Sequence, residues 1–224
     1  MEILERLRGL IAAGTGQFNM IEFGACDGYH TVQFINMLKA SGRPYRLDTF
    51  EPERENYASA QRAIASVKPT PQDNEHIVFL WPFAVGAEPG EKTFYVSGGQ
   101  KMEGGRVVDR YYGSSSIRAP KLVTQAWPSM TFREDRVQVC SLDSLHVLKY
   151  PIDFIWADIQ GAAGDMIAGG AATFKHVKQL YVEYDNSELY EGEVLGVAAI
   201  AALLPDFDVV EDYGGDVLLK NRLL

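Results

Sequence analysis

Acidic side chains frame a glycine-containing stretch near the N-terminus. It reads FNMIEFGACDG over residues 18–28, so a mostly apolar run passes into Gly24 and Gly28. Glycine at a strand-to-helix turn lets a ligand approach the backbone, and the helix that follows offers unpaired N–H groups. The carboxylates of Glu22 and Asp27 suit a cationic ligand, and Asp27 would repel a pyrophosphate. The stretch predicts a binding site for a ligand without phosphates; the alternative is that the glycines only close a turn.

A third carboxylate, Glu51, ends a predicted strand over residues 45–51, directly before Pro52. Ligands of doubly wound sheets bind at the carboxyl ends of the strands, where an acidic residue after the second strand can hold a ribose diol. A nicotinamide-dependent dehydrogenase would carry G-x-G-x-x-G at the first turn, and this turn has one glycine too few. S-adenosylmethionine combines a ribose diol with a sulfonium and an ammonium group and has no phosphate. It is the predicted cofactor, and an NAD-dependent oxidoreductase is the weaker alternative.

Groups that can take up a proton lie near the same predicted edge of the sheet. Asp158 ends a predicted strand over 152–158, and Glu183 lies near the end of the next one, over 177–184. His30 follows the glycine turn directly. A hydroxyl that accepts a methyl group must lose its proton, and a general base assists this by roughly 10²- to 10⁴-fold. Asp158, Glu183 and His30 are therefore the catalytic candidates, with capping or packing as the alternative role of His30.

Oxygen ligands for a metal gather at that edge too. Asp158 comes from one predicted strand, and Asp185 and Asn186 follow its neighbour. Mg²⁺ prefers carboxylate and amide oxygens, and a bound metal lowers the pKa of a hydroxyl group. These three residues form a candidate Mg²⁺ site, and ordinary solvated groups at strand ends are the alternative.

These side chains require a sheet that brings their strands to one edge. Hydrophobic runs and turn residues predict strands that alternate with helices, as in a seven-stranded α/β Rossmann-like sheet with helices on both faces and a C-terminal antiparallel hairpin. With 224 residues, 46% of them hydrophobic, the chain can bury one core, so residues 1–224 are predicted as a single domain. The predicted strands are 18–23, 45–51, 76–81, 92–96, 137–140, 152–158, 177–184, 207–211 and 216–220, and the predicted helices are 2–13, 29–40, 53–67, 164–174 and 193–204.

Two segments lie outside this regular alternation. Within residues 1–14, Ile3, Leu7 and Ile11 share one helical face, which predicts an N-terminal helix that packs on the sheet or covers part of the ligand site. Residues 97–136 are rich in glycine and contain consecutive serines at 114–116. A loop-rich insertion of this length is uncommon in a compact domain unless it is functional or disordered, and its aromatic residues argue against disorder. We expect a lid or an acceptor-binding segment.

Four sequence blocks resemble the FkbM-type S-adenosylmethionine-dependent methyltransferases. The resemblance runs from about residue 18 to the C-terminus, and the ordered set of blocks is more specific than any one of them. The blocks are EFGACDG at 22–28, FEP at 50–52, VCSLDSL at 139–145 and DFIWADIQGA at 153–162. The family usually carries one acidic residue where this chain has Gln160 and another where it has Gly164.

This resemblance implies a class I methyltransferase that methylates a hydroxyl of a sugar or another small metabolite. It also implies that Ala84 touches the adenine and that Ser114 and Ser115 bind the acceptor, with a flexible turn as the alternative for the serines. Tyr112, an aromatic residue of the 97–136 segment, is a further candidate for acceptor binding. Since the two family carboxylates are missing, a non-catalytic cofactor-binding or assembly module is a second alternative. The predicted cofactor-binding residues are Glu22, Gly24, Ala25, Asp27, Gly28, Thr31, Glu51, Pro52, Ala84 and Asp158.

Composition limits the partners. A net charge of −9 and a pI near 5.0 disfavour binding to nucleic acid or to an anionic membrane. The two cysteines, Cys26 and Cys140, are too few for a disulfide framework, so a reduced, cytoplasmic protein is expected. Acids interrupt the apolar residues of the N-terminus, so neither a signal peptide nor a membrane span is predicted there. The expected partner is a small-molecule acceptor, and a homo-oligomer stays open.

Overall fold

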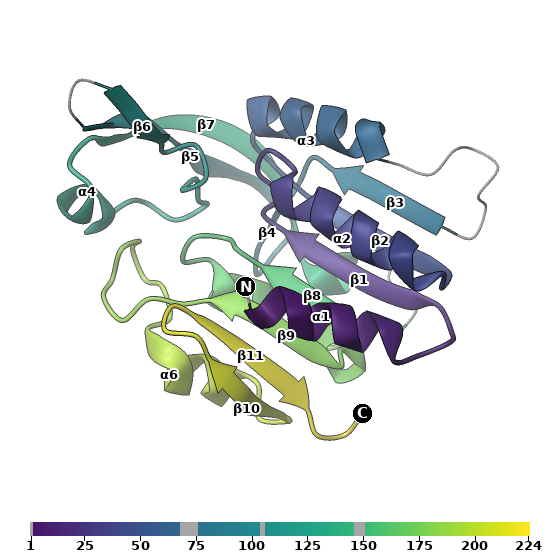
Figure 1. Cartoon of the computed structure of the whole chain (residues 1–224). Coiled ribbons are helices and arrows are strands. Elements are labelled where there is room, and N and C mark those ends of the chain that lie inside the picture. The colour runs from purple at the N-terminus through teal and green to yellow at the C-terminus, as the bar shows by residue number, and fades with distance from the viewer. Residues whose placement is uncertain (1, 68–75, 104–105, 146–150) are drawn as a thin grey trace.

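A computed structural model describes residues 2–67, 76–103, 106–145 and 151–224 (Figure 1). Its main sheet has seven strands in the order β10-β11-β9-β8-β1-β2-β3. The pairs β1–β2, β2–β3, β1–β8 and β8–β9 are parallel, whereas β11 runs antiparallel to both β9 and β10. This confirms the predicted seven-stranded sheet and its closing hairpin. The strands are β1 (Phe18–Phe23), β2 (Tyr45–Phe50), β3 (His76–Trp81), β8 (Phe154–Ala157), β9 (Gln179–Glu183), β10 (Phe207–Asp212) and β11 (Asp216–Asn221).

Strand β1 lies at the point where the chain changes direction across the sheet. Every residue of β1 is buried, as its run of apolar side chains predicts. The chain continues from β1 through β2 to β3 on one side and returns to β8 on the other. In doubly wound sheets a ligand binds outside the carboxyl ends of the strands at such a switch point. The topology therefore places the predicted glycine turn, which follows β1, at the expected binding position.

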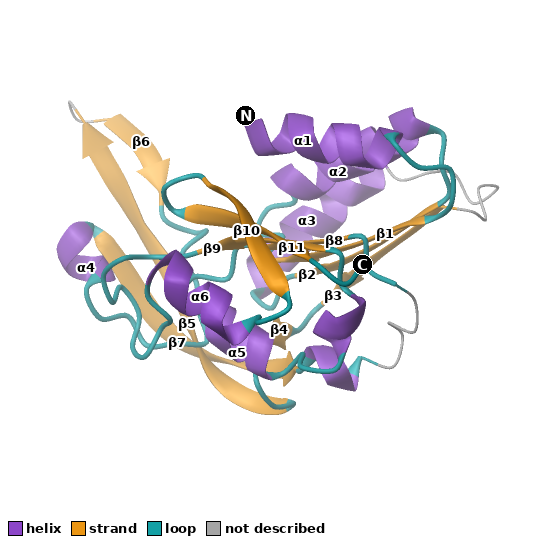
Figure 2. Cartoon of the chain, turned by 90° about the horizontal axis from the view of Figure 1, so that it is seen from below, coloured by secondary structure: helices purple, strands orange, loops and turns teal. Residues whose placement is uncertain are grey.

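Helices cover both faces of the main sheet (Figure 2). On one face Leu7 and Phe34 belong to a buried cluster with residues of β1 and β2. On the other face Met166 and Ile200 belong to a second buried cluster. The first face carries α1 (Glu2–Ala12), α2 (Tyr29–Ser41) and α3 (Arg54–Val67), and the second carries α5 (Ala163–Ala168) and α6 (Gly196–Leu203).

The helix predicted over residues 164–174 is wrong in its length. Helix α5 ends at Ala168, and a separate 3-10 turn, η2, covers Thr173–His176. A Cβ on Gly169 would lie 2.2 Å from the carbonyl oxygen of Gly86, so a close backbone approach occurs where the helix stops. A second 3-10 turn, η1, covers Leu142–Ser144 and carries a capping box between Ser141 and Ser144.

A second, four-stranded sheet projects from the main one (Figure 1). We call it the arm sheet; its order is β4-β7-β5-β6. The prediction of a loop-rich insertion over 97–136 is wrong for most of its described residues, because β5 and β7 pair from Gly90↔Val139 to Gly99↔Met130. Residues 104–105 of that segment lie outside the described part of the chain. The elements are β4 (Ala84–Val85), β5 (Gly90–Glu103), β6 (Arg106–Arg110), α4 (Val123–Ala126) and β7 (Met130–Cys140).

The glycines of this segment misled the sequence interpretation. Gly99 has a positive φ of 98°, and a Cβ there would lie 2.2 Å from the carbonyl oxygen of Ser129. A glycine is thus required where the two strands approach closely, although glycine is uncommon within strands. Phe94 and Val96 of β5 are buried with Val137 and Val139 of β7 in a small core of their own.

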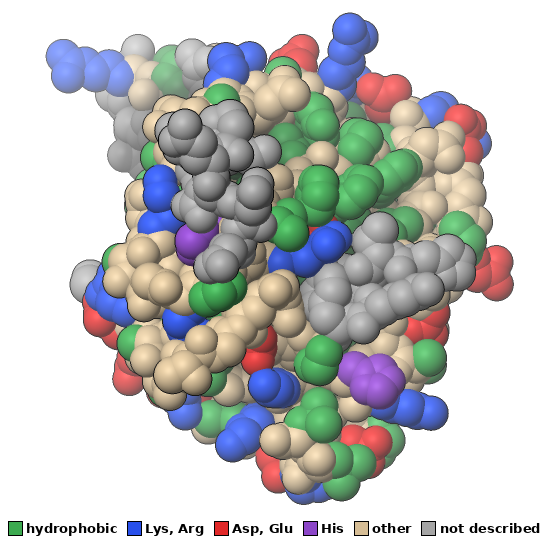
Figure 3. All heavy atoms as spheres, turned by 90° about the vertical axis from the view of Figure 1, so that its right-hand side faces the viewer, with side chains coloured by type: hydrophobic (Ala, Val, Ile, Leu, Met, Phe, Trp, Pro, Cys, Tyr) green, Lys and Arg blue, Asp and Glu red, His purple; other side chains and the backbone are tan. Residues whose placement is uncertain are grey.

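The surface mixes charged and hydrophobic side chains. On the face that Figure 3 shows, hydrophobic side chains gather in one area beside residues drawn in grey, with basic and acidic side chains around it. Within the described ranges, no helix is both long enough and apolar enough to span a membrane.

Replacing Gly24 should test how strictly the end of β1 is packed. Gly24 has a φ of 88°, and an added Cβ would lie 1.9 Å from the carbonyl oxygen of Asp158. We expect Gly24→Ala to lower the free energy of unfolding by about 3 kcal/mol or more, from backbone strain and overpacking together. The matched control is Gly42→Ala, which has a φ of 69° and nothing within 4 Å of the added Cβ. The control should cost about 1 kcal/mol in urea-induced unfolding, and equal losses would contradict the packing argument.

Candidate active site

A cavity of about 380 Å³ opens at the carboxyl ends of the main-sheet strands. Phe23 of β1, Phe50 of β2 and Asp158 after β8 contribute to its wall, so it lies at the switch point of the sheet. Phe94 of the arm sheet supplies another part of the wall, together with a segment that follows β6, through Tyr112, Gly113, Ser115, Ser116 and Ile117. A volume of this size is in the usual range for small-molecule sites. Of the predicted cofactor residues, those that line the cavity are Gly24, Ala25, Asp27, Glu51, Pro52, Ala84 and Asp158.

The turn after β1 is held by contacts with both neighbouring strands. The N–H groups of Gly24 and Ala25 donate to the carbonyl oxygen of Phe50, at 3.1 and 3.0 Å. On the other side, Gly24 lies directly against the backbone of Asp158. Cys26 then adopts a left-handed conformation with a φ of 51°, which is uncommon for a residue other than glycine. Such a conformation persists only where the surroundings enforce it, as at ligand sites.

Glu51 is the most firmly oriented carboxylate of the cavity. Its Oε2 accepts a hydrogen bond from the N–H of Cys26 and its Oε1 one from the N–H of Glu53, each at 2.8 Å. Burial raises the pKa of Glu51 to about 8, although both backbone donors favour the charged form. Each carboxylate oxygen can accept a second hydrogen bond. Glu51 thus retains acceptor capacity for the two hydroxyls of a ribose, which fits S-adenosylmethionine.

Three predicted cofactor residues lie behind the cavity and are absent from its lining. Glu22 is fully buried, and its Oε2 accepts hydrogen bonds from the hydroxyls of Thr31 and Thr49, each at 2.6 Å. Burial raises the pKa of Glu22 to about 7. Gly28 precedes α2, and a Cβ on it would lie 2.9 Å from the Cα of Ala60 in α3. Glu22, Thr31 and Gly28 therefore support the turn from inside the core.

His30 and Asp27 stand on the side of the cavity next to α2. Burial lowers the pKa of His30, while the carboxylates of Asp158, Asp27 and Asp216 act in the opposite direction. The imidazole is therefore largely neutral near pH 7 and can accept a proton. Asp27 accepts a hydrogen bond from the hydroxyl of Tyr112 at 3.2 Å. The structure thus brings His30, Asp27, Asp158 and Tyr112 to one cavity, as the sequence predicts.

Gln160, which stands where the family usually carries an acidic residue, joins Asp158 to Glu183. The Gln160 amide nitrogen donates to Asp158 Oδ1 at 2.7 Å and to Glu183 Oε2 at 2.8 Å. Burial raises the pKa of Glu183 well above its ordinary value, and the nearby Asp158 raises it further. Glu183 does not line the cavity, and its link to the cavity is the hydrogen-bonded bridge that Gln160 makes to Asp158.

The predicted Mg²⁺ ligands do not form a ready cation site. The position between Asp158 and Glu183 holds the Gln160 amide, which is a hydrogen-bond donor. Asp185 and Asn186 are absent from the cavity lining. Across the ranges that the structure describes, no group of three or more His, Cys, Asp and Glu side chains is arranged to hold a metal ion. The described residues thus give no support for the predicted Mg²⁺ site, which stays a prediction, and the chemistry below uses the side chains alone.

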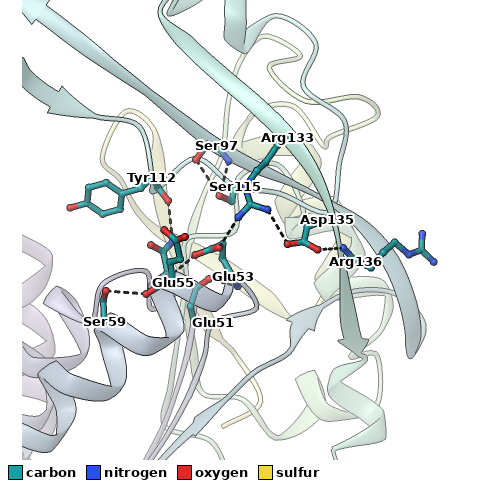
Figure 4. Close-up of polar contacts among 11 residues, drawn as sticks. Glu51, Glu53, Glu55, Ser59, Ser97, Tyr112, Ser115, Arg133, Asp135 and Arg136 are labelled. Atoms are coloured by element: carbon teal, nitrogen blue, oxygen red, sulfur yellow. Dashed lines mark hydrogen bonds and ion pairs between the residues drawn. The ribbon is translucent and has the colours of Figure 1, made fainter.

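The predicted acceptor residues lie on a segment, 111–117, that covers the cavity from the arm side. Tyr112 and Ser115 line the cavity, whereas Ser114 does not. The N–H of Ser97 donates to Ser115 Oγ at 3.0 Å, and the hydroxyl of Ser97 accepts from the N–H of Ser114 at 3.0 Å (Figure 4). The Ser115 hydroxyl is thus already engaged in folding the segment.

Several cavity residues were missed by the sequence interpretation. Cys26 orients Glu51 through its backbone, so its side-chain type gives no signal. Asn56 lines the cavity from the first turn of a helix whose other residues look like an ordinary exposed face. Ile117 reaches the cavity from a segment that was predicted to be irregular. In each case only the three-dimensional arrangement reveals the contact.

Comparisons with known proteins identify a methyltransferase family. The sequence profile of the methyltransferase FkbM domain matches residues 22–214, which includes every predicted site residue. Over 77 residues the chain is 48% identical to the 2-O-methyltransferase NoeI of Sinorhizobium fredii (strain NBRC 101917 / NGR234). That match covers 33% of this chain and 31% of NoeI. The family match favours the methyltransferase prediction over the nicotinamide-dependent alternative.

The fold has a solved counterpart. The crystal structure of methyltransferase FkbM from Methylobacillus flagellatus KT superposes with a TM-score of 0.55 at 15% sequence identity. The match covers 92% of this chain and 44% of that one. The chain thus spans less than half the length of this protein and about a third of NoeI. At this identity the likeness supports the class I methyltransferase fold alone.

The buried carboxylate of Glu22 should make stability depend on pH. Its pKa of about 7 lies above the ordinary value of 4.5, so its contribution is complete below pH 4.5 and is lost as the pH rises through 7. Glu22→Gln removes this titration. Between pH 5 and 8 we expect the free energy of unfolding to fall less in this variant than in the wild type, by up to about 3 kcal/mol. Urea-induced unfolding at several pH values measures the slope.

The exposed variant Glu134→Gln is the control, and its slope should match that of the wild type. Parallel slopes for Glu22→Gln and the wild type would show that Glu22 does not titrate in this range.

Proposed function

We propose that this chain, which belongs to the FkbM family of methyltransferases, transfers a methyl group from S-adenosylmethionine to a hydroxyl of a sugar or another small polyol-like metabolite. Family membership accounts for S-adenosylmethionine-dependent methylation. The hydroxyl acceptor is the further step, and the name of the relative NoeI, a 2-O-methyltransferase, supports it. The observation that carries the proposal is a single cavity with a ribose-type carboxylate, Glu51, and two proton acceptors, His30 and Asp158.

The cofactor would be held along the turn after β1. Glu51 would accept hydrogen bonds from the ribose hydroxyls, and Ala84 would lie against the adenine, as the family resemblance implies. Asp27 and Asp158 would face the positively charged part of the cofactor. When bound, S-adenosylmethionine supplies a methyl group already activated on a sulfonium, so alignment of the acceptor is the main requirement.

His30 and Asp158 would receive the proton of the acceptor hydroxyl. Both line the cavity, and the carboxylate of Asp158 acts electrostatically on the imidazole. A neutral imidazole can accept a proton, and a neighbouring carboxylate stabilises the imidazolium that forms. Burial and the neighbouring Asp158 raise the pKa of Glu183, and its side chain does not line the cavity, so Glu183 serves as a hydrogen-bonded neighbour and not as the first base.

The charge of the cavity favours an uncharged acceptor. Among the described side chains, its lining contains the carboxyl groups of Asp27, Glu51 and Asp158 and the imidazole of His30, and no lysine or arginine. A phosphorylated or carboxylated acceptor would meet repulsion there. Tyr29 and Tyr112 also line the cavity and are 68% and 44% exposed, so their rings could cover the apolar face of a sugar. The acceptor we propose is a neutral, ring-shaped polyol.

Glu51→Gln should weaken cofactor binding. The substitution replaces one of the two carboxyl oxygens that would accept the ribose hydroxyls with an amide NH₂ group, which can only donate. We expect the Kd for S-adenosylhomocysteine, measured by isothermal titration calorimetry, to rise about tenfold. Glu55→Gln, an exposed position in the same helix turn as Asn56, is the control. If both variants bind as the wild type does, the ribose assignment of Glu51 fails.

Asp158→Asn should slow methyl transfer without removing cofactor binding. We expect kcat to fall about 10²-fold while the Kd for S-adenosylhomocysteine changes less than about threefold, because a general base acts mainly in the transition state. The assay follows S-adenosylhomocysteine release with a panel of neutral methyl glycosides, their phosphates and their uronic acids.

Asp208→Asn, far along the chain on the edge strand β10, is the control for this substitution. Turnover of the anionic acceptors in preference to the neutral ones would contradict the proposed acceptor class.

A further inference from the structure

The arm sheet meets the first turn of α3 beside the cofactor cavity (Figure 4). Arg133 of β7 places its Nη2 3.2 Å from the Oε1 of Glu53. The side-chain amide of Asn56 donates to the carbonyl oxygen of Tyr112 at 3.0 Å. Two contacts therefore connect the arm side of the cavity to the helix that follows Glu51.

Glu53 links this junction to Glu51. Its side chain is only 5% exposed, and its Oε2 accepts a hydrogen bond from the N–H of Asn56 at 2.7 Å, so it caps the N-terminus of α3. The N–H of Glu53 donates to the Oε1 of Glu51 at 2.8 Å. One residue thus caps the helix with its side chain and orients the ribose-type carboxylate with its backbone.

Arg133 holds Glu53 from a well-fixed part of the arm sheet. It lies opposite Val96 in the β5–β7 register, next to Ser97, which anchors the segment 111–117 over the cavity. Its Nη1 also contacts the Oδ2 of Asp135 at 3.0 Å. The guanidinium is therefore held between the buried carboxylate of Glu53 and the exposed carboxylate of Asp135 on its own strand.

We propose that Arg133 is a positioning residue for the cofactor, acting through Glu53 on Glu51, so that docking of the arm sheet and binding of the ribose depend on each other. This inference rests on the proposed role of Glu51. An exposed ion pair contributes little by itself. Here, however, removal of Arg133 leaves a buried carboxylate without its cation, which is costly. If Glu53 then shifts, its backbone N–H group moves, and this N–H donates the hydrogen bond that orients Glu51.

The same strand offers a matched control in Arg136. Its side chain is 57% exposed, against 55% for Arg133, and its guanidinium also pairs with a glutamate, Glu91, at 2.9 Å. Glu91 is 51% exposed, and neither Arg136 nor Glu91 lines the cavity. The two arginines are thus alike in exposure and differ in their partners: Glu53 is buried and adjoins Glu51, whereas Glu91 is exposed and lies outside the cavity lining.

The test is the affinity for S-adenosylhomocysteine and for its 2′-deoxy analogue, measured by isothermal titration calorimetry. We expect Arg133→Met to raise the Kd for S-adenosylhomocysteine about tenfold, Arg133→Lys to recover most of that loss, and Arg136→Met to stay within about twofold of the wild type. Removal of the 2′-hydroxyl should weaken binding about tenfold in the wild type and in Arg136→Met. In Arg133→Met it should weaken binding less than about threefold, because Glu51 is already displaced.

The outcomes separate two failures. If the wild type binds S-adenosylhomocysteine and its 2′-deoxy analogue with the same Kd, the role of Glu51, on which the inference rests, is overturned. A wild type that discriminates, with Arg133→Met discriminating equally, overturns the role of Arg133 alone. Thermal unfolding of the unliganded variants accompanies the titrations, and if Arg133→Met does not fold, the comparison is made with Glu53→Gln, in which loss of the 2′-hydroxyl should weaken binding less than about threefold. Equal discrimination by Glu53→Gln and the wild type likewise contradicts the inference.

Discussion

The site depends on the close approach of Gly24 to the backbone of Asp158. A Cβ at Gly24 would lie 1.9 Å from that carbonyl oxygen, so the ends of β1 and β8 can meet only if this residue has no side chain. Where the two strand ends meet, Gly24 and Cys26 adopt left-handed conformations. The N–H groups of Gly24 and Ala25 donate to the carbonyl oxygen of Phe50, and the N–H of Cys26 donates to the carboxylate of Glu51. One backbone contact therefore aligns the ends of three strands, and each of them carries a residue of the cavity.

The second constraint is the burial of negative charge. Glu22, Glu51 and Glu183 all have a raised pKa, and burial is the largest cause for each. Carboxylates in such surroundings destabilise the fold as they ionise, and proteins commonly retain destabilising groups where binding requires them. A positively charged cofactor would offset part of this cost. The acidic lining of the cavity, with Asp27, Glu51 and Asp158, thus agrees both with a cationic cofactor and with the proposed neutral acceptor.

Much of the main sheet could be predicted because its local signals agree. The apolar run before Gly24 marks β1, and Pro52 marks the end of the strand that carries Glu51. The arm sheet was predicted only in part, as the strands over 92–96 and 137–140 that lie within β5 and β7. The rest was missed because Gly99 is typical of a loop and is required here by the close approach of Ser129. The same holds for the site: Glu51 and Asp158 follow strands and were found, whereas Arg133 and Asn56 contribute through contacts between distant elements. Glu22 was predicted to bind the cofactor because it lies next to the glycine turn. In the structure it supports that turn from the core and does not line the cavity.

In the proposed complex, the cavity binds S-adenosylmethionine with its ribose on Glu51 and its reactive end between His30 and Asp158. A crystal structure of the protein with S-adenosylhomocysteine tests this most directly. We expect both ribose hydroxyls within hydrogen-bond distance of the Glu51 carboxylate, the adenine against Ala84 and the sulfur on the side of His30 and Asp158. Density for the ligand elsewhere, or in this cavity with the ribose away from Glu51, would contradict the account.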